Sequence, residues 1–176
     1  MVHKLRSLFI LGLLATFSVL VSCNDDDEPK VSPIVGTWNY DSYKLDITVD
    51  GQDLLNYLVQ VMGLTQEEAI FAKAFFTASL FEDSDLEGTT FTFNADGTYS
   101  VKNGGVEEDS GTYQVQNNNT KLVLTSSDDG TVQEFEIETL TSNRMIVSFE
   151  DSFEEDINED ETLEEVGLDF ELTMVK

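Results

Sequence analysis

The chain has 176 residues and a formal net charge of −26, because 35 acidic residues face only 9 basic ones. This charge repels phosphate backbones and anionic headgroups, which excludes nucleic acid as a partner and leaves lipid as the only route to a membrane. The single histidine, His3, and the single cysteine, Cys23, both lie near the N-terminus. The rest of the chain therefore lacks a Ser–His or Cys–His nucleophile pair and a histidine-ligated metal. We expect a protein that is not an enzyme and has no cofactor or metal.

The N-terminal residues indicate an export signal. Lys4 and Arg6 precede an apolar run from Leu8 to Val21, which is shorter than the roughly 20 residues that span a bilayer. Leu20-Val21-Ser22-Cys23 resembles the lipobox of bacterial lipoproteins. The resemblance implies that residues 1–22 are a signal peptide and that Cys23 carries lipid. The alternative is an ordinary secretory signal whose apolar run happens to end in cysteine.

Residues 23–33 form the lipidated cysteine and an acidic tether, Asn24-Asp25-Asp26-Asp27-Glu28. One interpretation is a solvated spacer that keeps the domain clear of the lipid. The segment also resembles the acidic export signal of surface-exposed lipoproteins in Bacteroidota. That resemblance implies lipid anchoring in the outer membrane at the cell surface, with the inner leaflet of that membrane as the alternative.

The first strand of the folded domain, residues 34–176, begins at Gly36-Thr37-Trp38 and runs to about Val49. Trp38 and Tyr40 have even numbers and would share one face of the strand. The later apolar residues from Tyr43 to Val49 have odd numbers and would lie on the other face. Since one extra residue changes the phase of a strand, we expect a bulge near Asp41-Ser42.

A helical insertion of about residues 51–82 follows. Leucines at helical spacing indicate a first helix that ends at Gly63. Thr65 with Glu68 forms a capping box for a second helix, which continues to Phe81. This second helix is apolar nearly all round, so we expect it to be covered.

From Phe91 to the C-terminus apolar and polar residues alternate, which is typical of antiparallel strands with one core face. The predicted fold is mainly β, an antiparallel up-and-down barrel of about eight strands with two helices inserted between strands one and two. In such a barrel, every second loop between consecutive strands should lie at the same end of the barrel. Residues 94–97, 117–120 and 141–143 make short turns at the closed end, whereas the helical insertion and loops 104–109, 126–130 and 150–166 surround an open cup.

Gly36-Thr37-Trp38 at the head of such a barrel resembles the G-x-W motif of the lipocalins and their bacterial lipoprotein relatives, over residues 34–176. Lipocalins place their main helix after the last strands, whereas this insertion occupies the position of the loop that covers the cup. The resemblance implies a helical lid. Lipocalins also stack an arginine on the motif tryptophan, so we expect Arg144 to cap Trp38. A surface arginine paired with a carboxylate is the alternative.

Six aromatic residues are candidates for a ligand site, with ordinary packing as the alternative: Phe71, Phe75, Phe76, Phe81, Phe91 and Phe93. Residues 150–165 offer oxygen ligands of the kind that Ca²⁺ prefers. However, Glu161 stands where an EF-hand turn needs glycine, so we interpret this segment as a solvated loop. The pair Glu134 and Glu136 fits the wet outer face of a strand better than a glycosidase site.

Two functions follow from these observations. The first is a lipid-anchored protein that holds a small apolar or amphipathic molecule under the lid. The second is an interaction module with a filled barrel that contacts another envelope or extracellular component. They differ in whether empty apolar volume lies beneath residues 51–81, and the sequence names no particular ligand or protein partner.

Overall fold

The computed structural model describes residues 32–81, 83–158 and 160–176. Val31–Lys176 form one compact unit. The predicted signal peptide, Cys23 and the acidic segment 24–28 lie outside the described residues. Within the described ranges, no helix has the length and apolar character needed to cross a bilayer.

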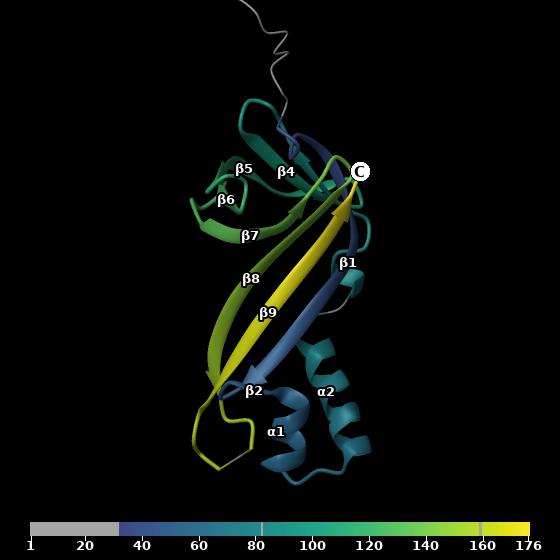
Figure 1. Cartoon of the computed structure of the whole chain (residues 1–176), viewed down its shortest axis with the longest axis vertical. Coiled ribbons are helices and arrows are strands. Elements are labelled where there is room, and N and C mark those ends of the chain that lie inside the picture. The colour runs from purple at the N-terminus through teal and green to yellow at the C-terminus, as the bar shows by residue number, and fades with distance from the viewer. Residues whose placement is uncertain (1–31, 82, 159) are drawn as a thin grey trace, which may run out of the picture. The chain divides into compact units, whose positions relative to one another are not determined.

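Eight antiparallel strands make a closed barrel (Figure 1). The sheet order is β1-β3-β4-β5-β6-β7-β8-β9, and β9 pairs with β1 to close it, while the two-residue β2 extends only the end of β1. Two helices lie between the first and second barrel strands, so the predicted fold class is confirmed. The bounds are β1 (Gly36–Val49), β2 (Gln52–Asp53), α1 (Leu54–Gln60), α2 (Gln66–Leu80), the 3-10 helix η1 (Asp83–Asp85), β3 (Thr89–Phe93), β4 (Thr98–Asn103), β5 (Val106–Gln116), β6 (Lys121–Ser126), β7 (Val132–Leu140), β8 (Arg144–Glu155) and β9 (Glu164–Val175).

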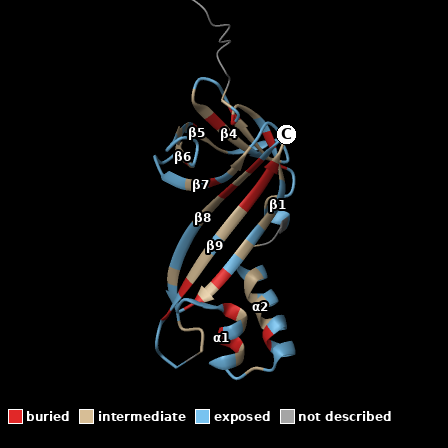
Figure 2. Ribbon diagram, in the orientation of Figure 1, coloured by how far each residue is buried: buried red, intermediate tan, exposed pale blue. Residues whose placement is uncertain are grey.

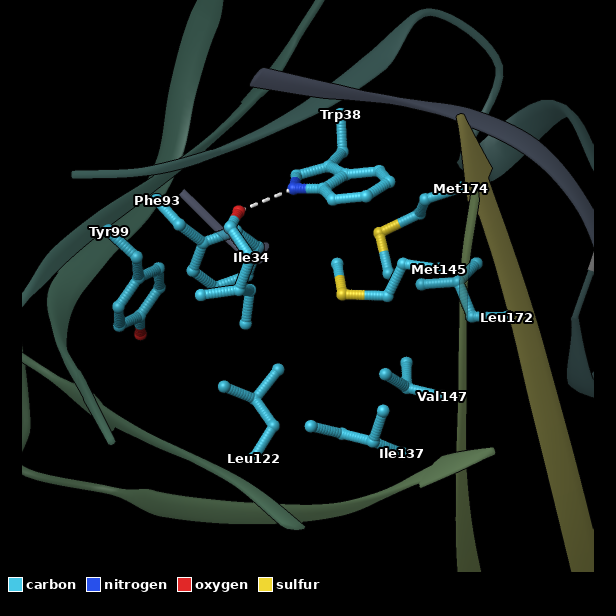
Figure 3. Packing of buried hydrophobic residues seen from close by; sticks show 10 residues of the cluster. All are labelled: Ile34, Trp38, Phe93, Tyr99, Leu122, Ile137, Met145, Val147, Leu172 and Met174. Carbon is cyan, nitrogen blue, oxygen red and sulfur yellow. Dashed lines mark hydrogen bonds between the residues drawn. The ribbon is translucent and has the colours of Figure 1, made fainter. Parts of the chain in front are cut away.

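The barrel interior holds a cluster of buried apolar side chains, here called the barrel core (Figure 3). Strand alternation directs every second residue inward, and burying each large one contributes about 1.5–3 kcal/mol. Trp38 is fully buried, and its Nε1 donates a hydrogen bond to the carbonyl oxygen of Ile34 at 2.7 Å. The barrel core consists of Ile34, Trp38, Phe93, Tyr99, Leu122, Ile137, Met145, Val147, Leu172 and Met174.

The predicted bulge in β1 is confirmed. The register of β1 against β9 shifts between Tyr40 and Ser42, so that Asp41 is the additional residue. Trp38 thus faces the barrel core, while Ile47 and Val49 face a different cluster further along the strand.

β1, β8 and β9 continue beyond the barrel. β1 pairs with β3 only from Gly36 to Asn39, and β8 pairs with β7 only as far as Ser148. β9 pairs with β8 along its whole length and with β1 from Val166 to Val175. Residues 42–49, 149–155 and 164–171 therefore form a three-stranded ribbon, here called the extension (Figure 1).

The helices cover one face of the extension. A second cluster, the extension core, comprises Ile47, Val49, Leu54, Tyr57, Leu58, Ala69 and Val166. The predicted capping box begins α2, since Thr65 and Glu68 each accept a hydrogen bond from the other's backbone. We expected these helices as a lid over the cup. The structure instead places them on the extension, because the apolar stripe of β1 continues past the barrel and must be covered there.

Two predicted loops are shorter than expected. β5 already begins at Val106, and β8 and β9 reach Glu155 and Glu164, which leaves only residues 156–163 as the connection. The density of carboxylates hides strand alternation there. Phe153 pairs with Val166 and both contribute to the extension core, whereas alternate residues such as Glu154 and Glu165 are exposed.

Candidate functional site: the groove between α2 and β1

An apolar groove of about 630 Å³ lies between α2 and β1. This volume is within the range of about 300–1,000 Å³ that is common for ligand pockets. Ala74 and Ala78 stand four residues apart on α2 and so share a face, and their small side chains leave space beside the strand. The lining residues are Tyr43, Leu45, Leu55, Ile70, Lys73, Ala74, Thr77, Ala78 and Phe81.

Lys73 is the charged residue of the groove lining. Its Nζ lies 3.1 Å from Oδ2 of Asp53, the residue that caps α1. Burial acts to raise the pKa of Asp53, but hydrogen bonds from Lys73 and from the backbone of Asn56 outweigh it and hold that pKa below its ordinary value. Both side chains remain partly exposed, so the ion pair positions Lys73 at the rim more than it stabilises the fold.

An aromatic cluster separates the groove from the barrel core. Tyr43 stacks on Phe170 with ring centroids 5.6 Å apart, and Phe81 meets both rings edge-on at 4.8 and 5.2 Å. Phe149 and Phe135 continue the cluster towards β7. Tyr43 and Phe81 thus form one end of the groove and close it against the barrel.

The opposite face of the extension is acidic. Glu150, Asp169 and Asp46 are direct cross-strand neighbours and line a shallow hollow on this outer face. Among the described residues, no group of three or more acidic, histidine or cysteine side chains is arranged to hold a metal ion. Adjacent like charges are unfavourable on a sheet, so this face is a region of concentrated negative potential.

The acidic loop 156–163 uses its oxygens internally. The Asp156 carboxylate accepts hydrogen bonds from the backbone N–H groups of Asp160 and Glu161. The Asn158 amide donates to Oε1 of Glu164 at 2.7 Å, and the Tyr57 hydroxyl donates to the same oxygen at 3.0 Å. Glu164 is buried, so this network fastens the loop to α1. A carboxylate surrounded in sequence by other carboxylates gives no signal of such a role.

The six aromatic residues predicted for a ligand site do not come together. Phe81 lines the groove, whereas Phe76 packs against the extension core and Phe71 and Phe75 are exposed on α2. Phe93 is buried in the barrel core, with Phe91 packed against it. Sequence reasoning missed the groove residues Tyr43, Leu45, Ala74 and Ala78, because α2 contains four alanines and nothing in its sequence marks this pair.

The cation over Trp38 is Lys176, where we expected Arg144. The Nζ of Lys176 lies 4.2 Å from the ring centroid and donates to the carbonyl oxygens of Pro33 and Val35 at 3.0 and 2.8 Å. Lys176 follows β9, the direct neighbour of β1, whereas Arg144 is exposed one strand further away on β8. Gly36 leaves room for this arrangement, since a Cβ there would lie 3.0 Å from the lysine stem.

Comparison with known proteins identifies a lipocalin-like domain over residues 34–147. The match includes both helices, strands β1 to β7 and the start of β8. A search of curated proteins finds no match. Among solved structures, a protein of the DUF4847 family from Bacteroides vulgatus is similar, at 12% identity and a TM-score of 0.36, covering 81% of this chain and 92% of that one.

Proposed function

Because the chain belongs to the lipocalin-like domain family, we propose that it is a lipid-anchored envelope protein that binds an apolar or amphipathic ligand and catalyses no reaction. The observation that carries this proposal is the apolar groove of about 630 Å³ on the outside of the barrel. We place the ligand there, between α2 and β1, rather than in the cup that the sequence suggested.

The side chains packed inside the barrel support this placement. Ten buried side chains meet inside it, among them the large Trp38, Met145 and Met174 (Figure 3). The aromatic cluster at Tyr43 and Phe170 lies between these side chains and the groove. A ligand of useful size therefore finds apolar walls more readily beside the barrel than within it.

The groove chemistry favours an amphipathic ligand. Its walls are mostly apolar, and Lys73 at the rim offers an ammonium group to a polar or anionic end. Lys73 must then exchange its contact with Asp53 or share it. Since that ion pair is partly exposed, such an exchange costs about 1 kcal/mol or less.

The proposed anchor leaves the groove accessible. A tether from a lipid on Cys23 enters the domain just before Gly36, at the start of β1. The groove begins at Tyr43, seven residues later, which is about 23 Å along an extended strand. The binding surface would thus lie away from the end of the domain that the tether reaches.

Native mass spectrometry of residues 31–176 tests ligand binding, since this fragment contains every described element and both cores. After incubation with a lipid extract, we expect a stoichiometric small molecule that dissociates on unfolding. Ala78→Trp, which fills the groove, should abolish uptake, whereas Ser79→Trp, at an exposed site outside it, should not. A bare mass for the wild-type fragment would count against ligand binding.

Lipidation is tested separately in cells. Metabolic labelling with an alkyne fatty acid should mark the wild-type protein in the outer-membrane fraction, and Cys23→Ser should remove the label. Surface exposure follows if added protease digests the anchored domain in intact cells. Labelling that persists in Cys23→Ser would refute the anchor.

A filled-barrel interaction module is the second candidate, and exposed apolar residues on α2 favour it. Ile70, Phe71 and Phe75 are 55%, 76% and 71% exposed, and most of α2 is open to solvent (Figure 2). Apolar groups gathered on a surface mark contact sites with other molecules. In this alternative, α2 contacts another envelope or extracellular component, and Phe71→Ser with Phe75→Ser should dissociate a complex that detergent extraction preserves.

A further inference from the structure

We propose that the ligand of the groove is an extended peptide segment that pairs with the free edge of β1 as an additional strand. This inference rests on the proposed binding function of the groove and names the ligand class. β1 pairs with β3 only up to Asn39 and with β2 only at Thr48 and Val49. Within the described parts of the chain, no strand pairs with that edge between Ser42 and Ile47.

The backbone groups at this edge can be assigned. The N–H of Asp50 donates to the carbonyl oxygen of Glu165 at 2.9 Å, so it points towards β9. Successive residues of a strand direct their N–H and C=O groups to alternate edges. The backbone N–H and C=O groups of Lys44 and Asp46 therefore point towards β9. Those of Tyr43 and Leu45 point towards the free edge. Val49 has the parity of Tyr43 and Leu45, and it pairs on that side with Gln52 of β2, which agrees with this assignment.

The free edge and the groove coincide. Tyr43 and Leu45, which present the edge groups, also line the groove. Ala74 and Ala78 of α2 form the opposite wall with little side-chain volume. A strand added to β1 would therefore lie in the groove, with every second side chain in contact with apolar walls.

The second free edge of the extension is unsuited to pairing. β8 has no β7 partner beyond Ser148, and the segment that follows carries Glu150, Asp151, Glu154 and Glu155. Charged side chains along an edge strand oppose the addition of another strand. The corresponding window of β1 carries two charged residues, Lys44 and Asp46, which pair with each other, and its apolar residues face a groove, which selects β1 as the site.

The charge of the extension specifies the other side chains of the ligand. An added strand would point its alternate residues outward beside Lys44 and Asp46 of β1, which form an ion pair, with Asp169, Glu171 and Glu150 on the strands behind them. Because the carboxylates of this face outnumber Lys44, lysine or arginine opposite Asp46 would reduce the repulsion that remains among them. The partner is therefore a segment of about six residues that alternates apolar and basic side chains, bound through backbone hydrogen bonds that confer affinity.

Amide hydrogen exchange measured by NMR on residues 31–176 tests the pairing directly. The probe is a peptide of about nine residues that alternates valine and lysine, matched by a scrambled peptide of equal composition. We expect the amides of Tyr43 and Leu45 to exchange at least about tenfold more slowly with the probe. The amides of Lys44 and Asp46 already bond to β9 and should not change. Uniform protection, or none, at saturating peptide would overturn the proposal.

Two N-methylated versions of the probe separate strand pairing from simple apolar contact. Methylating the alternate amides that face β1 should abolish binding, and methylating the other set should preserve it. Ala78→Trp should also abolish binding while Ser79→Trp retains it, provided that both variants keep the wild-type Tm. Equal binding of the two methylated peptides would refute pairing with the strand.

The outcomes distinguish this inference from the proposed function. If a molecule from the lipid extract occupies the groove in an Ala78-sensitive manner while the probe leaves exchange unchanged, the peptide inference is overturned and the binding function stands. If neither the extract nor the probe occupies the groove, both are overturned.

Discussion

Replacing Lys176 by methionine tests whether this residue, rather than Arg144, secures the start of β1. Methionine retains an unbranched apolar stem and removes the ammonium group. That group lies 4.2 Å from the Trp38 ring centroid and donates hydrogen bonds to the carbonyl oxygens of Pro33 and Val35. The variant therefore isolates these polar contacts from the packing of the stem.

The contacts set the expected cost. A cation over an indole contributes about 0.5–2 kcal/mol. Each hydrogen bond adds about 0.5–1.5 kcal/mol net to the stability. The lower end of this range applies here, because the carbonyl groups are incompletely buried and water can replace the ammonium. Since such values are not additive, we expect a loss of about 2 kcal/mol in the free energy of unfolding. For a domain of this size that loss lowers Tm by about 4–8 °C.

Urea unfolding of residues 31–176 provides the assay, followed by fluorescence of Trp38, the single tryptophan, and by far-UV circular dichroism. Arg144→Ala is the matched control. Arg144 is exposed on β8, so its loss should change stability by no more than about 0.5 kcal/mol. The reasoning is refuted if Lys176→Met has the stability of the wild type, or if Arg144→Ala is the more damaging change.

Three further predictions concern the interior. Gly111→Ala places a Cβ 2.0 Å from a carbonyl oxygen of the neighbouring strand, so we expect the free energy of unfolding in urea to fall by more than about 3 kcal/mol. A fall below about 1 kcal/mol would contradict this contact. Tyr57→Phe removes a hydrogen-bond donor to buried Glu164 and should lower the free energy of unfolding by about 1.5–3 kcal/mol. The control Tyr113→Phe, whose hydroxyl donates to an exposed carbonyl oxygen, should lower it by about 1 kcal/mol. Equal losses would argue against the buried network. Burial, and then the hydrogen bond to a carboxylate, raises the pKa of Tyr99 and of Tyr57 above the ordinary 10.0. The unfolded chain therefore releases these protons first, and urea midpoints should fall as pH rises above about 10; a constant midpoint from about pH 9 to 11 would refute the shift.

Much of the fold was predictable because local patterns carry it. The parity change between Tyr40 and Tyr43 requires an extra residue, and the structure has it at Asp41. Thr65 and Glu68 specify the start of α2 through their reciprocal hydrogen bonds. Alternation from Phe91 onward predicts the antiparallel barrel, because each strand needs one apolar face.

The remaining features depend on distances between strands, which a sequence does not contain. Phe153 and Val166 look like parts of an acidic loop until they are paired across the extension. The choice between Lys176 and Arg144 depends on which strand lies next to β1. The groove exists because Ala74 and Ala78 face an unpaired strand edge, and nothing in the local pattern of α2 reveals what that face meets.

The pairing of the first strand with the last also determines when the domain can fold. Asn39 and Val175 are neighbours in space although 136 residues separate them in the chain. β9 supplies Leu172 and Met174 to the barrel core and Val166 to the extension core, so both cores lack a wall without it. Contacts of such long range form slowly because a large loop must close first. A growing chain can therefore complete neither core until β9 has been synthesised.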